Sequence, residues 1–300
     1  MRDGVSASAL HCPAGGWPLL IDFLSERLPL VPRAEWLARM ARGEVLDDTG
    51  RPLAPDAAYR SGVRLYYYRQ LDAEPHIPFE ETVVFQDDWL VVADKPHFLP
   101  VTPKGRYVQQ TLLTRLKKRL GIANLTPIHR IDRETAGLTV FSVRPESRDA
   151  YQRLFRERHV DKLYEAVAPE PAQARQDLTL PMLYRSRLQE RADAFMQMQE
   201  VEGEPNAETH IELLRRLPGG LAHYALRPRS GRKHQLRAQM SALGLPIVGD
   251  RIYPLLQPAQ DPPDFEHPLQ LLARALAFTD PCTGQQRRFE STLQLALLAA

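Results

Sequence analysis

The sequence predicts an α+β protein whose larger part is built on a mixed, largely antiparallel sheet. Strand-like apolar runs outnumber helix-like stretches after residue 80, and the two kinds do not alternate strictly, as they would in a doubly wound dinucleotide fold. The chain also lacks a glycine-rich phosphate loop ending in Lys-Ser or Lys-Thr, and it lacks a His-Glu-x-x-His motif. Dinucleotide-binding, NTPase and metalloprotease classes are therefore disfavoured.

The first part of the chain predicts a small α/β module. Residues 1–16 lack hydrophobic periodicity and contain Gly, Ser, Ala and Pro, so we expect a flexible N-terminus. Over residues 17–70, apolar side chains at helical spacing predict two helices, and two strand-like stretches follow at 44–51 and 63–68. The helical sets are Leu20, Phe23 and Leu24, then Trp36, Leu37 and Met40. Residues 71–79 contain two prolines with acidic neighbours, which favours a linker.

Residues 80–300 predict the larger domain. Two β-rich runs, 83–86 and 89–93, flank the turn Asp87-Asp88 and predict a hairpin. Helical spacing of leucines over 112–120, closed by Gly121, predicts a helix, and Tyr151, Leu154 and Phe155 predict another. Further strands are expected at 138–143, 162–167, 208–214 and 222–226. A last helix is expected after the glycine turn at 230–237.

Composition narrows the function classes. The chain is 43% hydrophobic and 25% charged, which is ordinary for a folded protein. No apolar run approaches the ~20 residues that span a bilayer, and the start lacks the apolar core of a signal peptide. We therefore expect a cytoplasmic protein without a membrane partner. The two cysteines, Cys12 and Cys282, are far apart, which predicts neither a disulfide framework nor a thiolate metal site.

Positive charge gathers in one stretch although the net charge is only +2. Residues 101–165 contain fourteen Lys and Arg against seven Asp and Glu. Such a stretch can line a phosphate-binding face, or it can be the solvated surface of a helix. Charge alone leaves both interpretations open.

Asp132 stands in the first of three clusters that combine charged residues with turn formers. It lies between Arg130 and Arg133 in the segment from His129 to Gly137. Neighbouring cations keep a carboxylate ionised even when it is partly desolvated, and an ionised carboxylate in a cationic pocket can act on a sugar. The alternative is an ordinary ion-pair cluster on the surface.

The other two clusters place aromatic and basic groups on a strand and at a glycine turn. Lys162 and Tyr164 share one side of an expected strand, where the ring can stack on a base or simply pack in the sheet. The turn at 230–237 can present Arg232 and Arg237 to a phosphate or a carboxylate. Its alternative is a helix start with solvated basic residues.

In order and spacing, the three clusters resemble the RluA-type pseudouridine synthase family. That family's pattern is His-Arg-Leu-Asp-Arg-x-Thr-Ser-Gly, then Lys-x-Tyr, then Gly-Arg-x-His-Gln-Leu-Arg. The resemblance extends over roughly residues 80–298 and includes 93–96, 99–103 and 246–250. Ile131, Ala136 and Lys233 depart from the pattern, but none of them removes a group that the chemistry requires.

The first module resembles the small S4-type RNA-binding domain in degenerate form. Leu28-Pro29 precedes the second expected helix, and Gly43-Glu44-Val45 follows it. Basic residues remain around that helix, but acidic neighbours dilute them, so contact with RNA and simple packing both stay open. The basic residues are Arg33, Arg39 and Arg42, and the acidic ones are Glu35, Glu44, Asp47 and Asp48.

The family resemblance implies an enzyme without a cofactor or metal that isomerises specific uridines of structured RNA to pseudouridine. Ribosomal RNA is the favoured target and transfer RNA the second. Asp132 would act on a flipped-out nucleotide, by attacking C1′ or by removing the C2′ proton. Arg237 would pair with Asp132, and Tyr164 would stack on the uracil and assist proton removal from C5. Arg130 would contact the RNA backbone and fill the vacated space.

Further RNA contacts are expected from Arg133, Lys162, Arg232, His234 and Lys104, and no obligate protein partner is implied. Two other classes remain as alternatives. One is a catalytically silent RNA-binding or ribosome-assembly protein that keeps the fold. The other is a glycoside-processing enzyme that pairs Asp132 with Glu134, since two carboxylates are the usual machinery for that reaction.

Overall fold

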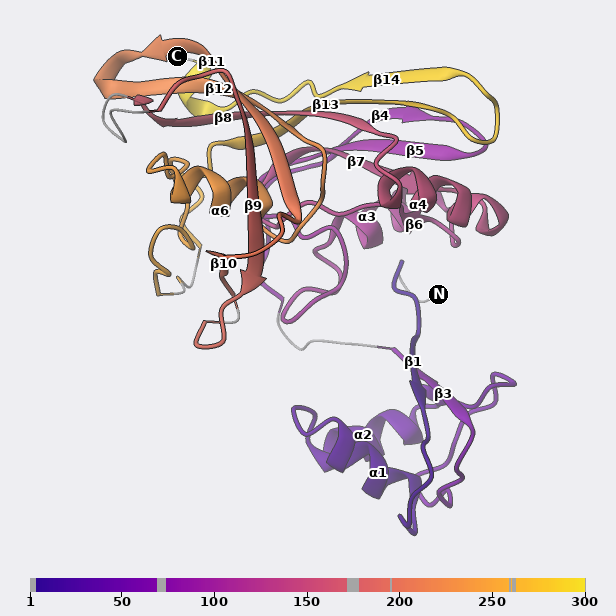
Figure 1. The fold of residues 1–300 in the computed structure, drawn as a ribbon. Coiled ribbons are helices and arrows are strands. Elements are labelled where there is room, and N and C mark those ends of the chain that lie inside the picture. Colours follow the sequence, from indigo (N-terminus) through magenta and orange to yellow (C-terminus); the bar gives the residue numbers. More distant parts are fainter. Residues whose placement is uncertain are drawn as a thin grey trace. The chain divides into compact units, whose positions relative to one another are not determined.

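The computed structural model describes residues 4–68, 74–171, 178–194, 196–258, 260 and 263–299. The chain divides into two compact units (Figure 1). Unit 1 comprises Met1–Glu74 and Thr114–Ala123, and unit 2 comprises Pro75–Leu113 and Asn124–Ala300. The expected division into terminus, module, linker and larger domain stays a prediction. Helix α3 (Leu112–Leu120), which lies within the expected larger domain, contributes residues to both units. Residues 1–3 of the expected terminus and 71–73 of the expected linker lie outside the described residues.

Unit 1 packs two helices against a small antiparallel sheet of strand order β1-β3-β2. The elements are β1 (Ser8–His11), α1 (Leu20–Arg27), α2 (Arg33–Ala41), β2 (Val45–Leu46) and β3 (Arg64–Tyr67). Both predicted helices are present, and their apolar faces meet around Phe23, Leu24 and Trp36, which are fully buried. Unit 1's resemblance to an S4-type domain stays a prediction.

Two features of unit 1 qualify the expectations from sequence. Strand β1 lies within residues 1–16, the stretch expected to be flexible. There, β1 pairs with β3, and Leu10 and the buried Cys12 pack into the core of unit 1. The three arginines around α2 are also paired with acids inside the unit. Arg33 bonds Asp22 at 2.7 Å, Arg39 bonds Glu35 at 2.7 Å and Arg42 bonds Glu44 at 3.0 Å.

In the described part of unit 2, eleven strands form one sheet. Its main path is β10-β9-β11-β12-β8-β13-β7-β5-β4, with β14 paired to β13 and β6 to β7. Neighbours pair antiparallel except β13 and β7, which run parallel over two residue pairs. The predicted mixed, largely antiparallel sheet is thus confirmed. The strands are β4 (Thr82–Gln86), β5 (Leu90–Lys95), β6 (Thr126–Pro127), β7 (Ala136–Ser142), β8 (Asp161–Pro169), β9 (Met182–Glu190), β10 (Met198–Val201), β11 (Ala207–Leu217), β12 (Leu221–Pro228), β13 (Leu271–Thr279) and β14 (Gln286–Glu290).

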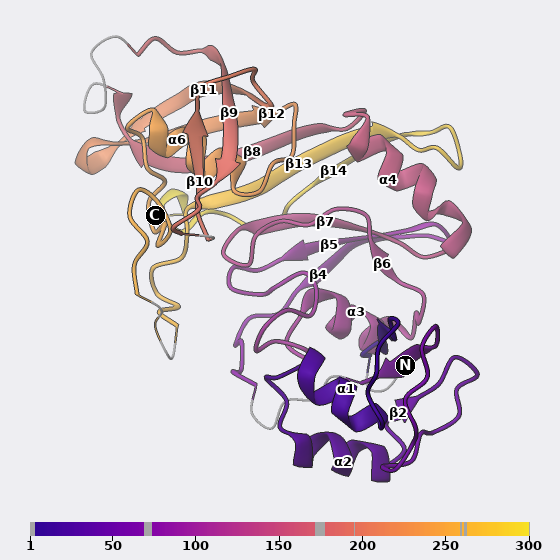
Figure 2. The ribbon, with the colours of Figure 1, turned by 60° about the horizontal axis from the view of Figure 1, so that its bottom comes forward.

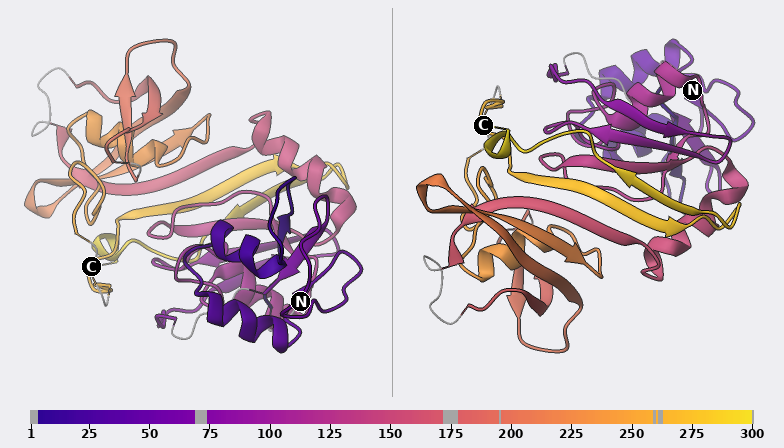
Figure 3. Two further views of the ribbon diagram at one scale, coloured as in Figure 1. Left: turned by 90° about the horizontal axis from the view of Figure 1, so that it is seen from below. Right: turned by 90° about the horizontal axis from the view of Figure 1, so that it is seen from above.

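Helices α4 (Arg148–Arg156) and α6 (Gln235–Ala242) lie on one side of this sheet in Figure 1. Under α6, Leu236 and Met240 pack against Tyr224 and Leu226 of β12. Under α4, Tyr151 packs in a second apolar cluster with residues of β5 and β7. Figure 3 shows the long strands β8 and β13 running side by side between these two regions. Among the described residues, no helix has the length and hydrophobicity needed to cross a membrane.

Five strands of unit 2 were not predicted from the sequence: the two-residue strand β6, and β9, β10, β13 and β14. Strand β9 carries arginines on its exposed side and is only partly apolar, and β10 and β14 are short and polar. Strand β13 reads Leu-Leu-Ala-Arg-Ala-Leu-Ala-Phe-Thr, a composition equally suited to a helix. Strand β13 is held by pairing with the distant strand β8, while β10 and β14 pair with their sequence neighbours β9 and β13, and local periodicity reveals none of these pairings.

The parallel contact between β7 and β13 requires a glycine. Gly137 has φ +107°, and a Cβ atom there would lie 2.3 Å from the carbonyl oxygen of Ala273. Ala273 is its partner in the β13–β7 register. A glycine inside a strand permits such a close approach of two backbones. This contact fixes the position of the first residues of β7. The loop that carries Asp132 precedes β7 and ends there.

We predict that Gly137→Ala destabilises the protein by about 3 kcal/mol, since it adds a clash to a left-handed φ. Gly284→Ala is the matched control, because Gly284 also has a positive φ of 73° but has open space around its Cβ position. The control should cost only about 1 kcal/mol. Urea unfolding of both variants measures the difference, and equal losses would contradict a close approach at Gly137.

Candidate active site

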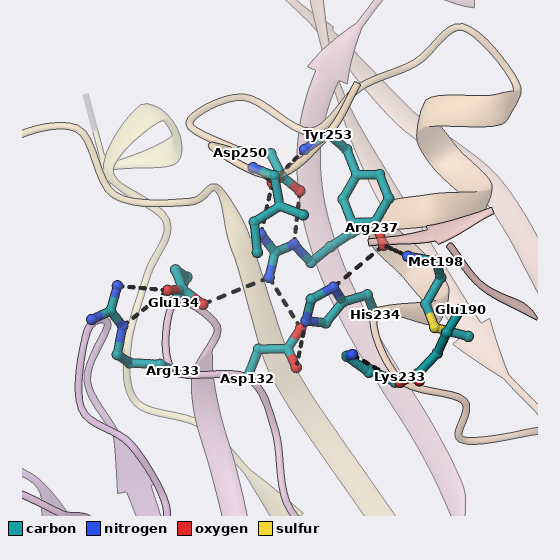
Figure 4. A network of polar contacts seen from close by, with 11 residues as sticks. Asp132, Arg133, Glu134, Glu190, Met198, Lys233, His234, Arg237, Asp250 and Tyr253 are labelled. Carbon is teal, nitrogen blue, oxygen red and sulfur yellow. Dashed lines mark hydrogen bonds and ion pairs between the residues drawn. The ribbon is translucent and has the colours of Figure 1, made fainter. Parts of the chain in front are cut away.

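Asp132 and Arg237 meet although 105 positions separate them in the chain. Arg237 Nη1 donates a hydrogen bond to Asp132 Oδ2 at 3.2 Å (Figure 4). Asp132 comes from the loop before β7, and Arg237 from the first turn of α6. The Asp132 side chain is 28% exposed, whereas that of Arg237 is 1% exposed. The carboxylate therefore faces accessible space while its cationic partner lies behind it.

Asp250 holds the Arg237 guanidinium in a fixed orientation. Arg237 Nε donates to Asp250 Oδ2 at 2.8 Å, and Nη2 donates to Oδ1 at 2.7 Å. The Asp250 side chain is 0% exposed. Two parallel bonds set the plane of a guanidinium, so Nη1 is left directed at Asp132. Burial alone would lower the pKa of Arg237, but the hydrogen bonds and charge of Asp250, with those of nearby carboxylates, raise it overall.

The loop around Asp250 is itself tightly held. Its Oδ1 accepts hydrogen bonds from the backbone N–H groups of Ile252 at 2.8 Å and Tyr253 at 3.1 Å. The preceding Gly249 has φ +77°, and a Cβ there would lie 2.4 Å from the Pro268 carbonyl oxygen. The backbone on both sides of Asp250 is thus fixed before its carboxylate contacts Arg237.

Glu134 is a third carboxylate near Arg237. Its Oε2 lies 3.6 Å from Arg237 Nη1, while its Oε1 accepts a hydrogen bond from Arg133 Nε at 2.9 Å. Burial raises the pKa of Glu134, but the Arg133 and Arg237 charges outweigh it and lower the pKa overall. Arg133 also lies over the Tyr107 ring, with its guanidinium carbon 5.7 Å from the centroid. Glu134 therefore remains ionised between two arginines.

Lys95 is hydrogen-bonded to the loop that carries Asp132. Its buried Nζ donates to the carbonyl oxygens of Pro96 at 2.9 Å and Arg133 at 3.0 Å. Burial lowers the pKa of Lys95 to about 7, although the charges of Glu134 and Asp132 oppose this shift. Next to it, His97 Nδ1 contacts the Glu134 carbonyl oxygen at 2.6 Å.

His234 lies between Asp132 and Tyr253. Its Nε2 is 3.8 Å from Asp132 Oδ1, and its Nδ1 is 3.3 Å from the Tyr253 hydroxyl oxygen. That hydroxyl accepts the Met198 N–H at 2.6 Å, so it can donate its own proton to Nδ1 and leave Nε2–H toward Asp132. Burial lowers the pKa of His234, and its side chain is only 8% exposed. The buried imidazole of His234 is therefore better positioned to contact Asp132 than to contact RNA, which is the contact expected from the sequence.

Tyr164 and Lys162 occupy strand β8. Burial raises the pKa of Tyr164, and the charge of nearby Asp132 raises it further, so the phenol stays protonated at neutral pH. Lys162 Nζ donates to the Ser230 carbonyl oxygen at 2.9 Å, and burial lowers its pKa to about 8. The ammonium of Lys162 thus connects β8 to the turn before α6. The predicted contact with RNA would instead require this group to extend into solvent.

Three basic residues expected to contact RNA are exposed. Arg130 has no hydrogen-bond or ion-pair partner within the described part of the chain. Arg232 Nε donates to the Asn206 carbonyl oxygen at 3.3 Å. Lys104 lies at the tip of a hairpin that it closes by bonding with Tyr107. The structure thus brings Asp132, Arg237 and His234 together and leaves these three at the surface.

Sequence reasoning missed several members of the site. It assigned no role to Asp250, Lys95 or Tyr253, and it considered Glu134 only as a partner in another reaction. Asp250 and Lys95 both lie in segments that the family resemblance covers, at 246–250 and 93–96, and this was the available signal. Among the described residues, no group of three or more His, Cys, Asp or Glu side chains is arranged to hold a metal ion.

Comparisons with known proteins point to one family. The family model described as RNA pseudouridylate synthase matches residues 89–242, which include Asp132, Tyr164 and Arg237. The chain is 30% identical over 242 residues to an uncharacterised RNA pseudouridine synthase of Synechocystis sp., covering 78% of this chain and 79% of that protein. It is 32% identical over 213 residues to the dual-specificity RNA pseudouridine synthase RluA of Haemophilus influenzae, covering 70% of this chain and 91% of that one.

Two solved human structures share the fold. Human RNA pseudouridylate synthase domain containing 4 is 27% identical with a TM-score of 0.54, covering 70% of this chain and 88% of that chain. Human RNA pseudouridylate synthase domain containing 1 is 22% identical with a TM-score of 0.58, covering 74% and 86% respectively. Both likenesses agree with the mixed sheet of unit 2.

The lowered pKa of Lys95 predicts a pH-dependent contribution to stability. Below pH 7 the amine is protonated in both states, but between pH 7 and 10.5 only the unfolded state keeps the proton. Stability rises with pH wherever the unfolded state binds more protons. We therefore expect wild type to gain stability relative to Lys95→Met as the pH rises from 7 to 9.5.

Urea unfolding at several pH values tests this expectation. The exposed Lys118→Met variant controls for the loss of one positive charge. A difference between wild type and Lys95→Met that stays constant over this pH range would contradict the assignment.

Proposed function

The chain belongs to the RNA pseudouridylate synthase family, in its RluA-type branch, and from this premise we propose that Asp132 is the carboxylate with which it isomerises uridines of structured RNA. Ribosomal RNA is the favoured target, and transfer RNA the second. The observation that carries the proposal is the partly exposed Asp132 carboxylate held against the buried, clamped guanidinium of Arg237. We place the reaction in the cytoplasm, without an obligate protein partner.

Pseudouridine formation exchanges one bond of the nucleotide for another. The bond between N1 and C1′ breaks, the uracil turns, and C5 joins to C1′ while the C5 proton moves to nitrogen. All atoms are retained, so the reaction is an isomerisation that consumes neither electrons nor water. What the protein must supply is a group that acts at the sugar, a site that holds the free uracil, and access to the nucleotide.

An ionised Asp132 can serve as the group that acts at the sugar. It can attack C1′ as a nucleophile or take the C2′ proton as a base, and both roles require the carboxylate form. Arg237 donates a charged hydrogen bond to Oδ2 and thereby orients the carboxylate. Among the residues that the structure describes, Oδ1 has only the longer contact of 3.8 Å with His234 Nε2, so we propose that Oδ1 faces the ribose.

Tyr164 and Arg130 are proposed for the other two requirements, which are to hold the free uracil and to give access to the nucleotide. The raised pKa of Tyr164, caused by burial and by Asp132, favours a neutral ring that stacks on the uracil over a phenolate that removes the C5 proton. A uridine within a helix must leave the stack before its C1′ can be reached. We propose that Arg130, which is exposed and stands two residues before Asp132, contacts the RNA backbone and fills the vacated space. Arg133, Arg232 and Lys104 are proposed as further RNA contacts.

We predict that Asp132→Asn lowers single-turnover conversion by at least about a thousandfold, as removal of a catalytic group does, and changes the Kd for RNA by less than about threefold. Asp161→Asn, an exposed exchange of the same kind on β8, should leave both quantities unchanged. Equal losses of binding and turnover in Asp132→Asn would count against its catalytic role.

Mass-tagging of pseudouridines in total RNA identifies the target. Cells that lack the gene would receive wild type, Asp132→Asn or Asp161→Asn. We expect one ribosomal or transfer RNA position to lose its pseudouridine in the deletion and to regain it with wild type and Asp161→Asn only. An RNA profile that is identical in all strains would contradict the proposed function.

A further inference from the structure

An exposed apolar loop follows directly after the residues that clamp Arg237. Leu255 is 76% exposed and Leu256 is 48% exposed. From Ile252 to Gln260 the chain contains no charged residue. In Figure 2 the stretch between α6 and β13 extends away from the sheet. Two adjacent leucines thus present apolar side chains to solvent on an uncharged stretch of the chain.

The loop is held in a closed shape. Arg251 Nη2 donates to the Pro258 carbonyl oxygen at 2.8 Å, and the Gln257 N–H donates to the Arg251 carbonyl oxygen at 2.8 Å. Its first residues, Ile252 and Tyr253, donate their N–H groups to Asp250. Because these bonds order the backbone in the free protein, binding through the leucines costs little further conformational entropy.

The loop begins beside Asp132. Tyr253 contacts His234, which faces the Asp132 carboxylate at 3.8 Å (Figure 4). Leu255 is two residues beyond Tyr253, so its Cα lies within about 7 Å of the Tyr253 Cα. The other exposed leucines of the described residues belong to other elements: Leu30 to unit 1, Leu183 to β9, Leu214 to a bulge of β11 and Leu297 to the short helical turn Ala296–Leu298.

The chemistry of the loop suits bases rather than phosphates. Phosphates are bound by cations and N–H groups, whereas apolar side chains that enter a helix pack on base faces and hold neighbouring bases apart. We propose that Leu255 and Leu256 form an apolar wedge that packs on the base next to the target uridine and keeps the stack open once that uridine has left it. This inference rests on the proposed function and adds a second element to base flipping beside Arg130.

Single-turnover kinetics of Leu255→Ser on two RNAs test the wedge. One hairpin carries [5-³H]uridine, paired, at the position found by pseudouridine mapping, and the other has an abasic site opposite that uridine. A wedge matters most where pairing must be broken, since an unpaired base flips at lower cost. We expect tritium release to slow about tenfold on the paired hairpin and less than about twofold on the abasic one.

The matched control is Leu214→Ser, which removes an exposed leucine from β11 and should leave both rates unchanged. A Leu255→Ser variant that is slowed equally on both RNAs, or on neither, would overturn the wedge while wild type still supports the proposed function. If wild type releases no tritium from either RNA, the proposed function fails and the wedge fails with it. Because Leu255 is mostly exposed, its replacement should not unfold the protein.

Discussion

The buried guanidinium of Arg237 is the constraint on which the rest of the site depends. A charge that is 1% exposed is costly unless it is paired and hydrogen-bonded, and Asp250 meets this need with two bonds. The helix that carries Arg237 packs on β12, and the backbone around Asp250 is fixed by Gly249 and its own hydrogen bonds. Asp132 receives the one guanidinium nitrogen that remains, at 3.2 Å.

Burial also adjusts the charge around this pair. Asp132, Asp250 and Glu134 are balanced by Arg237 and Arg133, whereas the pKa of Lys95 falls to about 7 and that of His234 is lowered, in both cases mainly by burial. The two residues can therefore support the loop and the carboxylate without adding two full positive charges at neutral pH. The close approach of β7 and β13 at Gly137 determines where this loop leaves the sheet.

Much of this site could be predicted from contiguous motifs. The rest could not, because it depends on contacts between residues that are distant in the sequence. Asp132, Tyr164 and Arg237 stand in patterned segments, and the apolar spacing of α1 and α6 marks those helices in the chain. Asp250 could not be assigned from local pattern, because its importance comes from the partner it meets in space. Lys162 and His234 were expected as RNA contacts, and the sequence did not show that both are largely buried and bonded within the protein. Strands such as β13 depend on pairing with β8 rather than on their own residues.

The central claim is that Asp250 acts on the reaction by orienting the Arg237 guanidinium toward Asp132. A double-mutant cycle in single-turnover conversion tests this directly, with Asp250→Asn, Arg237→Lys and the double variant compared after urea unfolding has shown that each is folded. Lysine keeps the charge but lacks the planar fork that Asp250 can orient. The account predicts that Asp250→Asn slows wild type strongly and adds little further loss to Arg237→Lys. An equal fold-loss from Asp250→Asn in both backgrounds would contradict it.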